Sequence, residues 1–465
     1  MKKKATVILG AGFTGLSAGY LLSKKGYKVT IIELNPSPGG IGSEIINDGN
    51  RYEMGAHLFH CPDKEILNEI KSVVGEHLIP IERTIKINFN GKYYDFPLKM
   101  HEVLFNLPVF TVIKSLTSYL YQRFKNLLLK KENKNTEDVL INNYGKVLYN
   151  IFFKSYIANV WGIKPSKFSP KFANQRIPNF NILEIISKLK KYIFSNMLNM
   201  KAIDVDNYVE KVEGQLYTTK KGFAGIAKVI ADKIILNGGS IIYNSKVERI
   251  ILGKENKIQS IEYFKKRKLY KISLDSLITT IPINNTIKMI YPKIIKPSVV
   301  QSLEKLKYRS LVFVGFIVKS KNNLPADLTY YRNLSFNRLT DLTSIGIEGK
   351  INDTRTIIAE ITCNTKDAVW ENDILAKTLV FDDLESENIF DKKQILDSHV
   401  FRLEHAYPIY IEDFDLALEN IKNHISEIPN ITTAGRQGNF QYINSHIAIR
   451  QGYNAAEHII NYYNN

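Results

Sequence analysis

The sequence predicts an α/β protein in which a dinucleotide-binding unit is interrupted by a helical insertion and accompanied by a mixed β-sheet unit. Three observations lead to this class: a glycine-rich turn between two apolar strands near the start, long helical patterns over residues 101–200, and a return to alternating strands and helices from residue 208. The 465 residues are too many for one compact core, so we expect two or three cooperating units.

The first segment, residues 1–98, opens with the strand, turn and helix of a nucleotide site. The run "ATVIL" precedes a G-x-G-x-x-G turn formed by Gly10, Gly12 and Gly15, and "LSAGYLLSKKG" suits a helix. The next apolar run, "YKVTIIE", ends at Glu33, where a dinucleotide fold has the acid that binds a ribose. A basic start and an apolar run are also typical of a targeting peptide, but the glycine spacing favours nucleotide binding.

The remaining segments follow from changes of pattern along the chain. Residues 99–203 carry Lys and Leu at three- and four-residue spacing and predict the helical insertion on the substrate side. Residues 204–282 return to the nucleotide-binding unit, with a helix that ends at a Gly-Gly pair and one strand after it. Residues 283–405 predict the β-sheet substrate unit. Residues 406–465 close the nucleotide-binding unit with a strand, a glycine-bearing loop and a helix that returns to the first sheet.

The composition of the chain indicates which kind of partner and which cellular compartment to expect. The net charge of +17 favours an anionic partner, but no basic block accompanies a nucleic-acid motif, so we do not expect nucleic acid. Cys61 and Cys363 lie far apart, which favours a reducing compartment and a cytoplasmic protein. No other apolar run approaches the length of a spanning helix. Residues 103–131 mix large apolar and basic residues: they suit a core-facing helix with lysines outward, or contact with an anionic membrane surface.

The order of motifs after Glu33 carries a family resemblance. "NPSPGGIGSE" is followed by "RYEMGAHLFH", and this order resembles flavin-dependent amine-oxidase-like proteins, more narrowly their UDP-galactopyranose mutase-like branch. The resemblance extends over nearly the whole chain and implies a Rossmann-like, glutathione-reductase-like domain that binds FAD. It assigns cofactor contacts to Gly10, Gly12, Phe13, Thr14, Gly15, Glu33, Gly39, Gly40, His57, Val247, Gly435 and Arg436. His57, His60 and Cys61 lack a distant partner for a metal, so no metal site is expected.

The same resemblance assigns substrate-binding residues. Tyr156 and Trp161 match two aromatics that hold uridine in the mutases, although from the residues alone both would be core aromatics. Arg176, Arg338, Tyr407 and Tyr442 match residues near the substrate, with Arg338 at the diphosphate. Two positions depart from the bacterial mutases, which have an arginine where Phe180 stands and an aspartate where His446 stands.

The resemblance implies interconversion of the pyranose and furanose forms of a UDP-sugar through an adduct between N5 of reduced FAD and the sugar. NAD(P)H is the implied reductant, the implied catalytic residues are His57, Arg338, Arg176 and Tyr442, and the implied role is polysaccharide biosynthesis. Phe180 and the apolar insertion favour an alternative, an FAD-dependent oxidoreductase of amine oxidase or protoporphyrinogen oxidase type that oxidises a small molecule. A flavin-containing binding protein without turnover also remains open. The sequence makes no prediction of oligomeric state.

Overall fold

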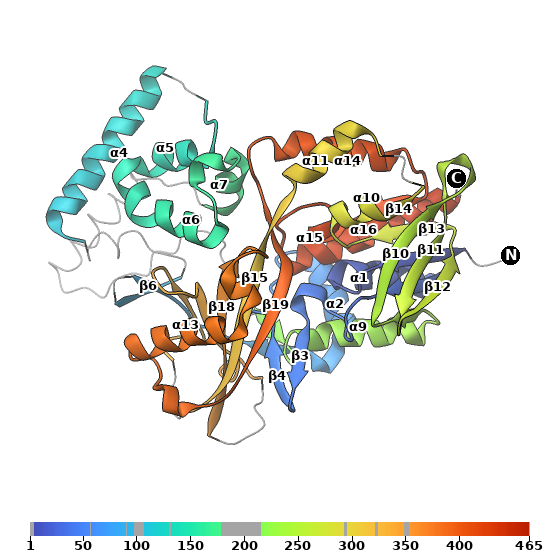
Figure 1. Ribbon diagram of the computed structural model, residues 1–465, viewed down its shortest axis with the longest axis horizontal. Helices are drawn as coiled ribbons and strands as arrows, with labels where there is room; N and C mark the ends of the chain where they lie inside the picture. The colour runs from blue at the N-terminus through green and yellow to red at the C-terminus, as the bar shows by residue number, and fades with distance from the viewer. Residues whose placement is uncertain are drawn as a thin grey trace.

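The computed structural model describes residues 4–55, 57–89, 91–96, 107–129, 132–177, 215–292, 295–320, 324–347 and 353–464. A Rossmann-like unit forms one end of the molecule, a helical unit forms the other end, and a large twisted sheet lies between and below them in the view of Figure 1. The expected α/β class is therefore confirmed.

The Rossmann-like unit is built on a parallel five-stranded sheet, whose strands come from four distant segments of the chain. Its order is β20 (Ile431–Thr433), β13 (Ser276–Thr279), β1 (Ala5–Leu9), β2 (Lys28–Ile32) and β9 (Ser240–Ile242). The helices of this unit are α1 (Phe13–Lys24), α2 (Lys64–Val74), α9 (Ala224–Leu236), α15 (Gly435–Gly438) and α16 (Ser445–Asn464). Helix α1 packs closely on the sheet, since a Cβ on Gly19 would stand 2.9 Å from Ile31 Cδ1. Parallel strands with buried faces explain the apolar runs at β1, β2 and β13.

A four-stranded sheet lies beside the Rossmann-like sheet. Its order is β12 (Lys268–Ser273), β11 (Ile258–Lys265), β10 (Ser245–Leu252) and β14 (Ile290–Tyr291). The expectation of one strand through "SIIYNSKVERIIL" is wrong, because β9 and β10 belong to different sheets. The chain turns between them at Asn244, which adopts a φ of +53°, a left-handed conformation that asparagine tolerates.

The substrate-side unit is a mixed seven-stranded sheet. Its order is β19 (Ile395–Ile409), β15 (Lys307–Lys319), β18 (Thr354–Cys363), β17 (Arg338–Asp341), β16 (Leu328–Tyr331), β6 (Ile85–Phe89) and β7 (Lys92–Asp95). Alternate residues of β15 face opposite sides. Val312 and Phe316 pack in a core with α13 (Asp373–Ser386), whereas Phe313 packs in another core with Tyr52. Strands β6 and β7 come from the first hundred residues, so the N-terminal segment contributes to both large sheets.

The helical unit contains α4 (Val109–Leu129), α5 (Thr136–Leu148), α6 (Ser155–Trp161) and α7 (Pro170–Arg176). The expected insertion is helical over these described parts, whereas residues 178–214 lie outside the described residues. Both α5 and α7 begin at side-chain caps, in which Asn135 accepts from the backbone N–H of Asp138 and Ser169 accepts from that of Lys171. Within the described chain, no helix is long and apolar enough to cross a membrane.

The other strands and helices connect these units. They are β3 (Glu44–Asn47), β4 (Asn50–Glu53), β5 (Ile79–Ile81), β8 (Leu216–Thr218), α10 (Ile283–Met289), α11 (Pro297–Lys305), α12 (Ala368–Glu371) and α14 (Phe414–Ser426). Cys61 and Cys363 are both buried free thiols. They do not form a disulfide.

Candidate active site

The turn between β1 and α1 leaves open space at one glycine. A Cβ on Gly10 would stand 2.7 Å from the Thr280 hydroxyl oxygen, and a Cβ on Gly15 would stand 2.0 Å from the Gly10 carbonyl oxygen. Among the described residues, Cα of Gly40 is the one atom that a Cβ added to Gly12 would meet within 4 Å, at 3.8 Å, and no side chain caps the helix there. The amides that begin α1 therefore suit a phosphate, which the helix dipole also favours.

Two further loops meet at the start of α1. Gly39 has a φ of +119° and donates its backbone N–H to the Ala11 carbonyl at 2.8 Å. From the end of the chain, Gly435 approaches Thr14 so closely that an added Cβ would stand 2.5 Å from the threonine hydroxyl oxygen. The segments around residues 12, 39 and 435 therefore meet at the start of α1. An elongated dinucleotide needs contacts from several such segments.

Glu33 ends β2 beside this cradle and is 5% exposed. One carboxylate oxygen accepts the Ala11 N–H at 2.6 Å and the other accepts the Asn35 N–H at 2.8 Å. Burial raises the pKa of Glu33, and these hydrogen bonds oppose the rise. The residues present therefore fit the pyrophosphate and ribose of a dinucleotide.

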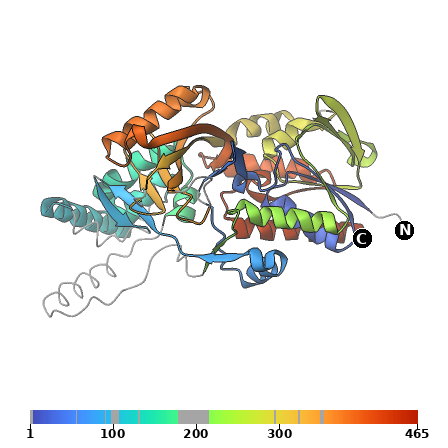
Figure 2. The same cartoon turned by 90° about the horizontal axis from the view of Figure 1, so that it is seen from below.

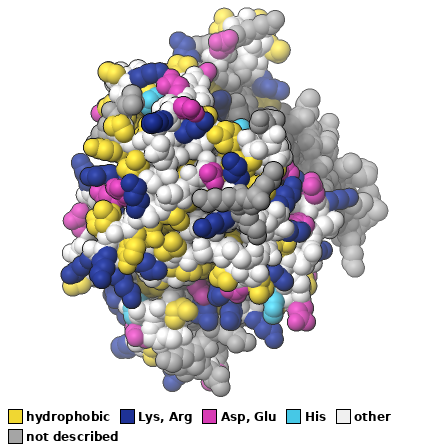
Figure 3. Space-filling model, turned by 90° about the vertical axis from the view of Figure 1, so that its right-hand side faces the viewer, with side chains coloured by type: hydrophobic (Ala, Val, Ile, Leu, Met, Phe, Trp, Pro, Cys, Tyr) yellow, Lys and Arg dark blue, Asp and Glu magenta, His cyan; other side chains and the backbone are white. Residues whose placement is uncertain are grey.

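A cavity of about 560 Å³ lies next to Glu33. It is lined by Leu34, Asn244, Lys246, Phe264, Lys266 and Arg267. Val247 follows Lys246 on β10 and is buried. Lys and Arg side chains gather on the face of the molecule seen in Figure 3, which is the end that carries β10, β11 and β12 in Figure 1.

The segment after β4 brings His57 near the start of α1. Its ring stacks on Phe223, with ring centroids 5.5 Å apart, and Phe223 also contacts Phe13 at 4.7 Å. His57 Nδ1 is buried without a hydrogen-bond partner among the described residues. Burial, and then the positive charges of Arg338 and Arg436, lower the pKa of His57 to about 3. The imidazole is therefore neutral at physiological pH.

Arg338 begins β17 and faces Glu360 on β18 in the sheet register. The guanidinium donates from Nε to Oε1 at 2.6 Å and from Nη2 to Oε2 at 2.5 Å, which leaves Nη1 outside this ion pair. Burial tends to lower the pKa of Arg338, but the Glu360 carboxylate outweighs it and the pKa is raised. A Cβ on Gly55 would stand 3.1 Å from Arg338 Nη2 and 3.2 Å from His57 Cε1, so the arginine and histidine lie close together.

Aromatic rings surround the arginine. Trp161 lies with its ring centroid 5.5 Å from that of Tyr407 and 5.8 Å from that of Tyr442, and the two tyrosine rings are 5.1 Å apart. Burial raises the pKa of Tyr156 and of Tyr407, and the charge of Arg338 opposes both shifts. Tyr156 and Tyr407 are therefore neutral donors and acceptors at physiological pH.

The described residues bring five of the six substrate candidates together, namely Tyr156, Trp161, Arg338, Tyr407 and Tyr442. Trp161 is only 7% exposed and also packs on Phe168 and Phe172, so its ring is largely covered by protein. Arg436 approaches Tyr442 at 4.7 Å from the ring centroid and donates to the Ile443 carbonyl.

Three other positions were singled out in the sequence. Arg176 is the last residue of α7, and its side chain lies outside the description. Phe180 is outside the described residues. His446, in the first turn of α16, pairs through Nδ1 with the His60 carbonyl at 3.2 Å.

Two buried acids in this region were missed by the sequence analysis. Glu360 is the lone charge in the apolar run "TIIAEITC", which was the available signal. Glu53 ends β4, accepts the Phe223 N–H at 2.6 Å and is 3% exposed. Burial raises the pKa of Glu53 to about 8, and the backbone hydrogen bonds oppose the rise.

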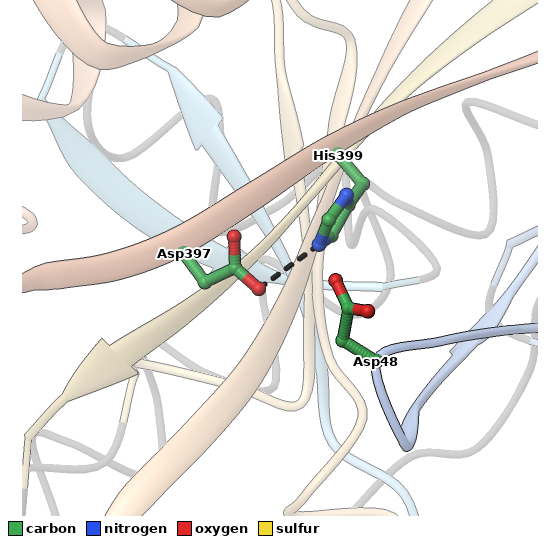
Figure 4. Close-up of side chains that lie close together, drawn as sticks. All are labelled: Asp48, Asp397 and His399. Carbon is green, nitrogen blue, oxygen red and sulfur yellow. Dashed lines mark hydrogen bonds and ion pairs between the residues drawn. The ribbon is translucent and has the colours of Figure 1, made fainter.

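A separate group of side chains has the composition of a metal site. Asp48, Asp397 and His399 bring ligand-type atoms within 4.8 Å of one another, and Figure 4 shows both carboxylates directed toward the imidazole. The His399 ring pairs with Asp397 at 2.9 Å and with the Asn47 amide at 2.9 Å, which accounts for its position without an ion. Among the described residues, His57, His60 and Cys61 do not form such a group.

The parallel sheet, the glycine cradle, the buried Glu33 and the cluster of aromatic side chains near Arg338 define a dinucleotide-dependent enzyme. The sequence model of the family described as flavin containing amine oxidoreductase matches residues 13–349. The chain belongs to this family, and FAD is the cofactor that its cradle fits.

Two curated relatives and one solved structure are similar to this chain. The chain is 25% identical to a probable UDP-galactopyranose mutase of Klebsiella pneumoniae over 181 residues, 38% of this chain and 46% of the relative. It is 24% identical to a phytoene desaturase of Fusarium fujikuroi over 249 residues, 50% of this chain and 41% of the relative. These matches span less than half of each relative. A crystal structure of reduced UDP-galactopyranose mutase has a TM-score of 0.80 and 19% identity, and covers 99% of this chain and 96% of that chain.

Proposed function

We propose that the protein interconverts the pyranose and furanose forms of a UDP-sugar, with reduced FAD as cofactor and NAD(P)H as its reductant. The observation that carries the proposal is the setting of Arg338. Its guanidinium lies beside His57, is oriented by Glu360 and has Nη1 outside that ion pair. A cation held among neutral aromatic groups suits a diphosphate attached to a sugar and a planar base.

Each residue of this aromatic cluster would have its own role in binding or catalysis. Arg338 Nη1 would bind a diphosphate oxygen and stabilise the charge that grows as the anomeric bond breaks. Tyr407 and Tyr442 would donate hydroxyl hydrogen bonds, and Tyr156 would stack on the uracil. Neutral His57 would support the isoalloxazine ring without adding a charge near it. When bound and reduced, FAD supplies the electron-rich nitrogen that the reaction needs at the anomeric carbon.

One observation favours a second candidate, an FAD-dependent oxidoreductase that oxidises a small molecule. Trp161 is covered on several sides by other aromatic rings, so its ring offers little free face for a base. A cluster of neutral aromatic side chains would equally suit an amine or a polycyclic substrate. The relatives of the family include a desaturase, which agrees with this alternative.

One assay separates the two candidates. The FAD-loaded protein is reduced anaerobically with NADPH, UDP-galactopyranose or another UDP-sugar is added, and the products are separated by chromatography. A mutase forms a furanose while consuming only a catalytic amount of reductant. Failure with every UDP-sugar, together with stoichiometric oxygen consumption and peroxide formation from an amine or a porphyrinogen, would overturn the proposal in favour of the oxidoreductase.

A further inference from the structure

Helix α4 turns its polar side toward the protein and its apolar side outward. On the inner side Ser115 and Tyr119 are buried, the Gln122 amide donates to Asn142 Oδ1 on α5 at 2.6 Å, and the Ser118 hydroxyl accepts the Val147 N–H at 3.3 Å. Val112 packs against the core from the inner side. Nine other large apolar side chains of α4 are between 53% and 78% exposed, and they are Val109, Phe110, Ile113, Leu120, Tyr121, Phe124, Leu127, Leu128 and Leu129. The expectation of a core-facing helix with lysines outward is therefore wrong.

The contact between α4 and α5 fixes the orientation of α4, with its apolar side outward. A Cβ on Gly145, which has a φ of +76°, would stand only 2.8 Å from the Tyr119 backbone nitrogen, so α4 and α5 meet at a glycine. Contacts through small and polar residues, with apolar side chains directed outward, are typical of helices that face lipid. A rotation of α4 that buried its leucines would break the hydrogen bonds to α5. The exposed apolar side is therefore part of the folded structure.

Charged residues flank this apolar side. At about 100° per residue, most of the exposed apolar side chains fall on one arc of the helix. Lys114 and Lys125 lie beside one edge of the arc and Arg123 lies beside the other. Residues 109–129 contain no Asp or Glu. In both Figure 1 and Figure 2, α4 lies at the end of the molecule far from the five-stranded sheet.

We propose that α4 docks in the plane of a bilayer that contains anionic lipids. The apolar arc would enter the acyl boundary, while the lysines and the arginine extend to the lipid phosphates. Charge complementarity favours this occupant over a second copy of the chain, because two α4 helices would bring basic flanks together without an acidic partner. The three cations within the helix agree with a helix that lies on a membrane. This proposal does not depend on the proposed reaction.

The test uses the full-length FAD-loaded protein and sedimentation with vesicles. We expect binding to vesicles of equal parts phosphatidylglycerol and phosphatidylcholine, and weaker binding to phosphatidylcholine alone. The triple variant Leu120→Ser/Phe124→Ser/Leu127→Ser should lower the partition coefficient at least about tenfold, because three large apolar groups no longer enter the bilayer. Lys114→Glu/Lys125→Glu should weaken binding to the anionic vesicles and raise its sensitivity to salt.

A matched control removes equally exposed apolar groups elsewhere. Leu236→Ser/Ile374→Ser/Leu416→Ser, on α9, α13 and α14, should leave vesicle binding unchanged, because these side chains are at least 67% exposed but lie on other helices. Flavin absorbance and the thermal midpoint verify that each variant is folded. Absence of binding by the unaltered protein, or equal binding by the α4 and control variants, would overturn the proposal. A dimer that the α4 variant converts to a monomer, without vesicle binding, would assign the face to a second copy.

Discussion

Arg338 and Glu360 stand directly opposite each other on β17 and β18 and share two hydrogen bonds, at 2.6 and 2.5 Å. The glutamate side chain is 3% exposed and the arginine side chain 19% exposed, so the pair is largely shielded from water. Removing one partner of such a pair leaves an uncompensated charge, whereas removing both charges together costs much less. A test of Arg338 therefore has to separate its structural role in this pair from its role in ligand binding.

We expect Arg338→Met alone to lower the free energy of unfolding by about 3–5 kcal/mol, because the Glu360 carboxylate stays buried. Adding Glu360→Gln should recover most of this loss. The double variant should keep the flavin absorbance and bind UDP-galactose at least about tenfold more weakly, as expected for a lost charge-assisted contact. Urea unfolding and calorimetric titration measure the two effects. Unchanged nucleotide-sugar affinity in the double variant would show that Arg338 supports only the sheet.

We expect substitutions of two glycines in the same turn to have different effects, one on FAD binding and the other on stability. Gly12→Val places its side chain in the open space before α1, so we expect a folded protein that no longer retains FAD. Gly15→Ala places a Cβ at 2.0 Å from the Gly10 carbonyl oxygen, so we expect a loss of stability whether or not FAD is present. Thermal unfolding of the apoprotein and flavin content after purification separate the two effects. A yellow, fully loaded Gly12→Val protein would contradict the assignment of the cradle.

Glu53 makes stability depend on pH. Its carboxyl has a pKa of about 8 in the folded protein, against an ordinary value of 4.5, because it is buried. Below pH 4.5 both states hold the proton. As the pH rises toward 8, the unfolded chain releases the proton first, so stability falls, on the order of 1.4 kcal/mol for each pKa unit, and then levels off. Glu53→Gln does not titrate, so it should be more stable than the unaltered protein at pH 8.

The same comparison at about pH 3.5 provides the control for Glu53. There the two proteins should have nearly equal free energies of unfolding, because the glutamate is almost fully protonated in both states. Denaturant unfolding at several pH values measures the difference. A difference that does not change between about pH 3.5 and pH 8 would mean that the carboxyl is already ionised in the folded protein.

The sequence predicted those parts of the site whose partners lie close in the chain. Gly10, Gly12, Gly15 and Glu33 fall within one strand, turn, helix and strand, where spacing alone fixes the geometry. The role of Glu360 depends on strand pairing, which places it opposite Arg338 across the sheet. Spacing along the chain carries no information about that register.

The orientation of α4 could not be predicted for a related reason. Its periodic pattern of apolar and polar residues correctly indicated a helix. Such a pattern has two sides, and the usual rule assigns the apolar side to the core. Here the polar side meets α5 through Gln122, Ser118 and the close approach at Gly145, contacts that only the tertiary structure reveals.

Tyr156 and Trp161 were treated alike in the sequence, but their surroundings predict different effects of substitution. Trp161 is 7% exposed and contacts four aromatic rings, so Trp161→Ala should cost about 3–5 kcal/mol of stability through the cavity it leaves. Tyr156 is less completely enclosed by protein. If its ring stacks on the uracil, Tyr156→Ala should weaken UDP binding about tenfold with a smaller loss of stability, because base stacking contributes about 1–3 kcal/mol.

Tyr156→Phe is the matched variant, because it keeps the aromatic face and removes only the hydroxyl. We expect it to bind UDP within about threefold of the unaltered protein, since stacking needs no hydrogen bond. Calorimetric titration with UDP, which lacks the sugar, isolates the nucleotide contribution from that of the reacting centre. If Tyr156→Phe weakens UDP binding as much as Tyr156→Ala does, the hydroxyl makes the contact and the ring does not stack. If neither variant changes UDP affinity while Trp161→Phe does, the base lies against Trp161 despite its burial.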